Sequence, residues 1–174
     1  MYIVSESRQD EEITAFHEAG HALMAILLGH PVQKISIGCA YQLDAYCQLD
    51  PMVSEKIRSH LETRIKHMVL VAMSGIAAEV LTFGQFDVSG ASDDLLKARG
   101  LASCMNRDER HIDSYLNRCE TQALFQLSQY WDPLCMIANC LLKYGEMDGR
   151  EATRIVRTCG VISSTFPMTG GLAI

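Results

Sequence analysis

The chain has 174 residues, which is enough for one domain with a sizeable hydrophobic core. Hydrophobic residues make up 48% of the sequence and charged residues 21%, proportions that are typical of soluble globular proteins. The formal net charge of −6 argues against the strongly basic surface with which many proteins bind nucleic acids. We therefore expect no nucleic-acid partner.

The sequence predicts neither a secretory signal nor a membrane span. The most apolar stretch, Met68 to Leu81, is shorter than the roughly 20 residues that a spanning helix needs, so we expect a buried core helix there. The seven cysteines are odd in number and never spaced as Cys-x-x-Cys, which disfavours both a disulfide framework and a thiolate zinc site. Reduced core thiols are typical of a cytoplasmic protein.

The predicted elements are mainly helical, with one small β element. Apolar residues at helical spacing predict a first helix over about residues 9–28, which Gly29 and Pro31 end. Segment 32–38 alternates and predicts a strand, and segment 44–50 predicts a second strand that would pair with it. Further helices are predicted near residues 54–67, 68–83, 91–106, 109–130, 132–145 and 149–158. The expected fold class is mainly α with a small β-sheet or hairpin, in one domain over residues 1–174.

The first predicted helix carries a His-Glu-x-x-His pattern formed by His17, Glu18 and His21. Residues four apart lie on one face of a helix, so both imidazoles can reach one metal ion. Glu18 lies about 100° around the helix from His17, where it would act on water as a general base. Two histidines in so apolar a helix would otherwise need hydrogen-bonding partners.

A catalytic zinc usually has three protein ligands, and spacing alone does not identify the third. Seven residues have suitable side chains, and no second helix has an equally clear pattern. They are His30, His60, His67, His111, Glu79, Asp93 and Asp94.

The order of several motifs resembles the peptidase domain of FtsH-type ATP-dependent zinc metalloproteases. The stretch TAFHEAGHALMAILLGHPVQKISI, Thr14 to Ile37, looks like that family's zinc helix and following strand. The stretch MSGIAAEVLTFG, Met73 to Gly84, resembles its GGRAAEE…FG segment. The stretch VSGASDDLLKARGLA, Val88 to Ala102, resembles its TTGASNDL segment. The resemblance covers most of Thr14 to about Met105 and implies the fold of that peptidase domain.

The resemblance implies Asp94 as the third zinc ligand, because the family's ligand is the aspartate before the aliphatic residue in ASNDL. Asp93 stands where the family has Asn, and both acids would also suit the first turn of a helix. Glu79, in the predicted core helix, is expected to support the site from behind the ligands. Asp93 and Glu79 remain the alternative ligands.

The chain also departs from the family pattern. It has no G-x-x-x-x-G-K-[ST] phosphate loop, and SGIAAEV lacks the Arg and the second Glu of GGRAAEE. These departures bear on ATP coupling and on the family's hexameric ring, and they leave the metal site intact. A homo-oligomer or a separate partner stays open.

The resulting hypothesis is a zinc-dependent metalloendopeptidase that works without ATP. Zn²⁺ on His17, His21 and Asp94 would activate water, with Glu18 as the base. Its substrates would be peptides or unfolded protein segments, which would add as a strand beside residues 32–38. The alternatives are a zinc-retaining scaffold protein, a non-peptide zinc amidase, and a domain cut from a longer protease.

Overall fold

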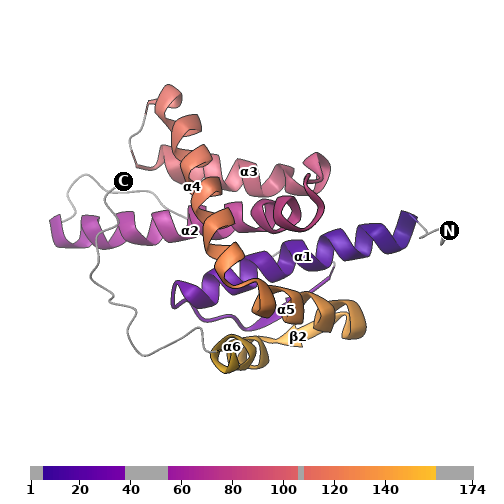
Figure 1. Ribbon diagram of the computed structural model, residues 1–174. Coiled ribbons are helices and arrows are strands. Elements are labelled where there is room, and N and C mark those ends of the chain that lie inside the picture. Colours follow the sequence, from indigo (N-terminus) through magenta and orange to yellow (C-terminus); the bar gives the residue numbers. More distant parts are fainter. Residues whose placement is uncertain (1–5, 38–54, 106–107, 160–174) are drawn as a thin grey trace.

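The computed structural model describes residues 6–37, 55–105 and 108–159, and it is mainly helical with one small sheet (Figure 1). This confirms the predicted fold class. In chain order the elements are α1 (Glu6–Leu27), β1 (Lys34–Ser36), α2 (Glu55–Phe83), α3 (Val88–Ser103), α4 (Glu109–Gln129), α5 (Trp131–Tyr144), β2 (Glu146–Asp148) and α6 (Gly149–Thr158).

Helices α1 and α2 form the centre of the domain. Helix α2 packs against α1, α3 and α4, and α1 also packs against α5 on its other side (Figure 1). A Cβ atom on Gly20 would lie 2.4 Å from the Ser74 carbonyl oxygen and 2.7 Å from the Ala78 Cβ. Only glycine therefore allows α1 and α2 to approach this closely, and the approach is made between His17 and His21 of α1.

Helix α2 is one continuous helix, whereas the sequence analysis predicted two helices over 54–67 and 68–83. That prediction was wrong because residues 67 and 68 mark a change from polar to apolar sequence, with no Gly or Pro to end a helix there. By length and composition alone, His60–Phe83 is long and apolar enough to cross a membrane. Since 72% of its most apolar 18-residue window is buried inside the protein, the apolar residues of that window already have protein partners, as in a core helix.

The small sheet joins segments that lie far apart in the sequence. Strands β1 and β2 are antiparallel, and Ile35 lies opposite Met147, both of them buried. Strand β2 was not predicted, because three residues between two helices give no alternation to detect. Gly145 ends α5 with φ of 77°, and the chain then turns directly into the strand. The predicted second strand, 44–50, lies outside the described residues.

Helix α3 begins at Val88, three residues earlier than predicted. The side chain of Asp87 accepts hydrogen bonds from the backbone N–H groups of Ser89 and Gly90 and so caps the helix. The first turn of α3 therefore contains no acid. Asp93 and Asp94 lie in the second turn, where the attraction of first-turn acids to the helix dipole does not explain them.

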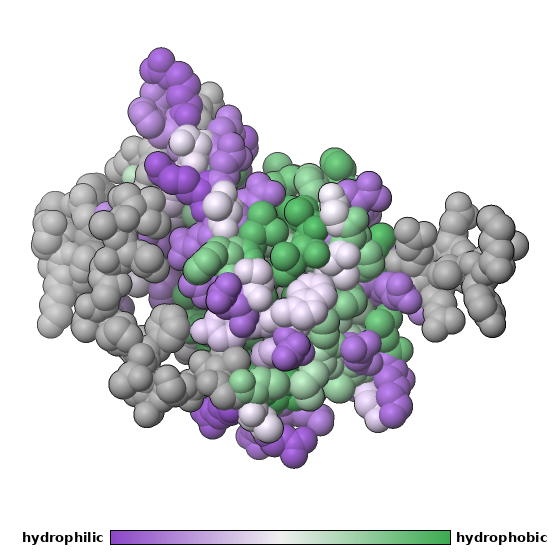
Figure 2. All heavy atoms as spheres, viewed as in Figure 1, coloured by the Kyte–Doolittle hydropathy of each residue, from purple (hydrophilic) through white to green (hydrophobic). Residues whose placement is uncertain are grey.

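Helix α4 extends past the other helices at its N-terminal end, which Figure 2 shows as a hydrophilic projection at the top of the view. Arg99 of α3 forms an ion pair with Asp113 of α4 near this end. The buried face of α4, which includes Tyr115 and Leu127, packs on α2. Helix α4 thus covers a face of α2, as α5 covers a face of α1.

Candidate metal centre

Side chains from α1 and α3 meet at one point between the helices. The Nε2 atoms of His17 and His21 lie 2.9 Å apart. The Asp94 Oδ2 lies 2.8 Å from the His17 Nε2 and 3.0 Å from the His21 Nε2. Among the described residues, these three form the one group of three or more His, Cys, Asp or Glu side chains that could hold a metal ion.

The hydrogen bonds of the two Nδ1 atoms determine which nitrogen of each imidazole carries the hydrogen. The His21 Nδ1 lies 2.7 Å from the Val71 carbonyl oxygen, which only accepts, so this nitrogen carries a hydrogen. The His17 Nδ1 lies 2.5 Å from Glu79 Oε1 and donates in the same way. With both rings neutral, the two Nε2 lone pairs would point toward each other and toward the Asp94 carboxylate. Three acceptors at such distances would repel one another unless a proton or a metal ion lay between them.

The pKa shifts of His17 and Asp94 also indicate that this group of side chains favours a positive charge. Burial disfavours the charged form of His17, but the hydrogen bonds to Asp94 and Glu79 outweigh it and raise the pKa of His17 to about 9. Burial alone would raise the pKa of Asp94, yet the hydrogen bonds from His17 and His21 hold it well below its usual range. A proton on His17 supplies that positive charge, and a divalent metal ion bound to the same three side chains would supply it as well. Two imidazoles and one carboxylate are also the ligand set of a catalytic zinc with one position left open.

Glu18 lies beside this group in a cleft of about 160 Å³ that His17, His21, Asp94 and Lys97 also line. Its side chain is buried, with 9% of the residue exposed, and no hydrogen bond to its carboxylate is found among the residues that the structure describes. Burial raises the pKa of Glu18, although the positive charge near the imidazoles opposes that shift. A carboxylate that is held in a cleft, and readily takes up a proton, is suited to general-base chemistry.

Glu79, one of the alternative ligands, lies behind His17 rather than beside the Nε2 atoms. One of its oxygens faces the His17 Nδ1 and the other accepts the backbone N–H of Asp87 at 2.7 Å. It therefore orients the ring, which is the supporting position that the sequence analysis expected. Its contact with Asp87 also links the imidazole to the start of α3, the helix that carries Asp94.

The other candidates from the sequence lie away from the meeting point. Asp93 is exposed at the edge of the cleft and is not in the three-residue group. His30 and His67 pair with each other at 3.0 Å. His60 and His111 are exposed.

Three contributors to the site were not predicted from the sequence. The Val71 carbonyl, which fixes His21, has no sequence signal because any residue could supply it. Lys97 lies 3.5 Å from the Asp94 Oδ1, the oxygen that faces away from the histidines. A Cβ atom on Gly75 would lie 2.6 Å from the His17 Nε2 and 2.7 Å from the His21 Cε1. The glycine within an apolar predicted helix was the sequence signal for this close contact between α2 and the two imidazoles.

Comparison with known proteins adds to this geometry. The sequence model of Peptidase family M41 matches residues 4–108. The chain is 36% identical over 109 residues to the ATP-dependent zinc metalloprotease FtsH of Synechococcus sp., an alignment that covers 59% of this chain and 16% of that protein. It is 39% identical over 109 residues to the ATP-dependent zinc metalloprotease YME1L of Drosophila melanogaster, covering 57% of this chain and 14% of that protein.

A third relative is the ATP-dependent zinc metalloprotease FtsH 2 of Sphaerobacter thermophilus, at 34% identity over 103 residues. That alignment covers 57% of this chain and 15% of the relative, so the chain matches only about a sixth of the length of these proteins. The matched region contains α1, α2 and α3, the three helices that build the site. The chain belongs to peptidase family M41.

Proposed function

We propose that this protein is a zinc-dependent metalloendopeptidase that cleaves peptides or unfolded protein segments. The observation that carries the proposal is the meeting of three acceptors, from His17, His21 and Asp94, in the cleft that Glu18 lines. The relatives named above are zinc metalloproteases by name, and they support zinc as the metal of this site.

When bound to these side chains, zinc supplies a Lewis acid that lowers the pKa of water and polarises a peptide carbonyl. The protein's own residues do the rest. Glu79 and the Val71 carbonyl fix the two imidazoles so that their Nε2 atoms point into the cleft. Glu18 takes a proton from the attacking water and returns it to the departing amine, a role that its raised pKa favours.

The substrate is proposed to bind as an extended strand along β1, which follows α1 after a short connection. Strand β2 occupies one edge of β1, and no strand pairs with the other edge among the described residues. A free edge offers backbone N–H and C=O groups to an extended peptide. The two-stranded sheet would thereby gain a third strand from the substrate.

The proposed reaction needs no ATP in this chain, whose sequence has no phosphate-binding loop, unlike relatives that are ATP-dependent by name. Without energy-driven unfolding, accessible substrates are flexible tails and unfolded segments. Folded proteins should resist cleavage.

The test combines zinc content with cleavage of unfolded casein, with and without ATP, for the wild type and Glu18→Gln. We expect one zinc per chain in both proteins, and cleavage by Glu18→Gln that is at least about 100-fold slower than cleavage by the wild type. Glu151→Gln, which removes an exposed carboxylate on α6 that lines neither the cleft nor β1, is the matched control and should cleave normally.

Zinc in both proteins without cleavage in either would overturn the peptidase proposal in favour of a scaffold protein or a non-peptide amidase. Equal cleavage by Glu18→Gln would overturn the role of Glu18.

A further inference from the structure

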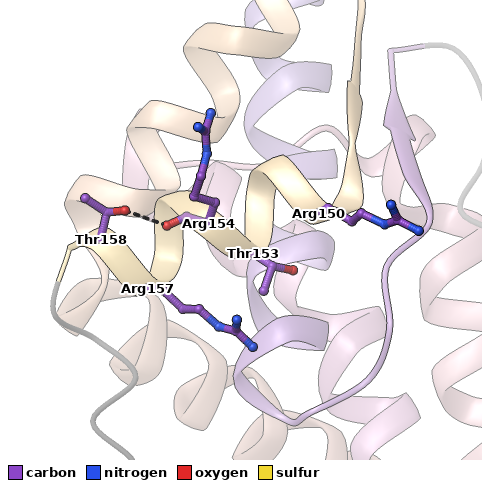
Figure 3. Close-up of a pocket in the computed structure, with 5 residues that line it drawn as sticks. All are labelled: Arg150, Thr153, Arg154, Arg157 and Thr158. Carbon is purple, nitrogen blue, oxygen red and sulfur yellow. Dashed lines mark hydrogen bonds between the residues drawn. The ribbon is translucent and has the colours of Figure 1, made fainter.

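Helix α6 presents three arginines to solvent. Arg150, Arg154 and Arg157 are exposed, whereas Ala152, Ile155 and Val156 on the other side of the helix are buried. Spacings of four and three residues put the arginines in one stripe. Together with Thr153 and Thr158 they line a hollow of about 450 Å³ (Figure 3).

The positive charge of this stripe is poorly compensated. Arg154 lies 3.3 Å from Glu151, but both side chains are more than half exposed, so that ion pair is weak. Arg150 and Arg157 have no ion pair within the described ranges, 6–37, 55–105 and 108–159. The carboxylate of Asp148 accepts the backbone N–H of Arg150 and caps the helix instead. A chain of net charge −6 thus carries a local excess of positive charge.

The guanidinium groups are the donors that a ligand would meet. The hydroxyls of Thr153 and Thr158 donate to the carbonyl oxygens of Gly149 and Arg154, each at 2.8 Å, so they are already used. Figure 3 shows the three arginine side chains extending in different directions rather than toward one point. Seven residues of helix span about 10 Å. The stripe therefore suits several separate anionic groups better than one small ion.

We propose that this arginine face, Arg150, Arg154 and Arg157, binds an acidic segment of another polypeptide. Carboxylates on alternate positions of a strand, or one turn apart on a helix, have the spacing that the stripe requires, and guanidinium groups bind carboxylates in forked pairs. The overall charge of −6 disfavours a nucleic acid, whose charge extends well beyond the stripe. A membrane is disfavoured because the exposed positions of α6 have no large apolar side chain to insert, as the hydrophilic lower edge of Figure 2 shows.

The test is fluorescence anisotropy with a labelled peptide of alternating Glu and Ser, beside the same peptide with Gln in place of Glu. The wild type should bind the acidic peptide alone, and more weakly as salt is added. The double variant Arg150→Gln, Arg157→Gln should bind at least about tenfold more weakly, because two charge-assisted contacts are lost. Its melting temperature should stay that of the wild type, since both side chains are exposed.

The matched control removes the same charge elsewhere, with Arg110→Gln and Lys143→Gln on exposed positions of α4 and α5. It should bind the acidic peptide within about twofold of the wild type. Equal binding by the wild type and the α6 variant, or no binding at low salt, would overturn the proposal. So would arginine-dependent binding to phosphatidylglycerol vesicles or to inorganic phosphate without binding to the peptide, because the partner would then be a lipid surface or a free anion.

Discussion

Two pairs of histidines meet in this domain with similar ring geometry and opposite surroundings. The rings of His17 and His21 have centroids 4.5 Å apart and an angle of 86°, and those of His30 and His67 are 5.1 Å apart at 76°. The closest ring nitrogens are 2.9 Å apart in the first pair and 3.0 Å in the second. Ring geometry alone therefore does not distinguish a metal centre from a structural contact.

The neighbours make the difference. Asp94 and Glu79 flank the first pair, and they raise the pKa of His17 to about 9 against the effect of burial. Burial and then the positive charge of Arg64 lower the pKa of His30, while burial and then His30 lower that of His67. The surroundings of the first pair favour a positive charge, and those of the second pair disfavour one. The carboxylates, rather than the ring geometry, thus make the first pair the candidate metal site.

The largest expected effect comes from the carboxylate of the first pair. Asp94→Asn should lower zinc affinity by more than about 100-fold. Loss of a residue that only orients a ligand typically costs about 10-fold to 100-fold in affinity, and loss of a ligand itself should cost more. Asp93→Asn should stay within about threefold, since Asp93 lies outside the three-residue group. Competition with a chromophoric chelator measures both. The reverse order would identify Asp93 as the ligand.

The next effect concerns the second carboxylate. Glu79→Gln should weaken zinc binding by about 10-fold to 100-fold, because the His17 Nδ1 loses its charged acceptor. Glu146→Gln, which removes an exposed carboxylate paired with Lys34, serves as the control in the same titration. Unchanged affinity in Glu79→Gln would show that the ring of His17 needs no carboxylate behind it.

A smaller effect is expected where α2 passes the first pair. Gly75→Ala would place a Cβ within 2.7 Å of both imidazoles, so it should lower the free energy of unfolding by about 1–3 kcal/mol. Gly100→Ala, on α3 with no neighbour within 4 Å of the added Cβ, should raise it by about 0.5–1 kcal/mol. Urea unfolding of both variants measures the contrast. Equal effects of the two substitutions would mean that the imidazoles move aside without cost.

The smallest effect is the pH response of the second pair. The pKa of His67 is lower in the folded than in the unfolded state, so its contribution to stability is complete above about pH 6.5 and is lost as pH falls from there toward the folded pKa. His67→Gln cannot titrate, and its unfolding free energy should therefore fall less than that of the wild type between about pH 7 and pH 5. Parallel curves for the two proteins would contradict the lowered pKa.

The residues of the site that lie close together in the sequence could be predicted from the sequence. The His-Glu-x-x-His spacing places His17, Glu18 and His21 on α1 because four residues make about one helical turn. The third proposed ligand, Asp94, could not be predicted from spacing, because its side chain meets that of His17 only after α1 and α3 pack on α2. Spacing left seven candidates, and only the family resemblance singled out Asp94.

The fold was predictable to a similar extent. Six of the eight elements agree in type and approximate position with the predictions, because each has its own periodicity or stop signal. The continuous α2 and strand β2 were missed. A change in polarity without Gly or Pro looks like a boundary, and a three-residue strand depends on a partner that lies far away in the sequence.

The central claim is that only the carboxylate-flanked histidine pair holds zinc. Its most direct test is the zinc content per chain, after dialysis, of the wild type and two double variants, His17→Ala with His21→Ala and His30→Ala with His67→Ala. We predict one zinc per chain in the wild type and in the second variant, and none in the first. Zinc retained by the first variant, or lost from a correctly folded second variant, would contradict the account.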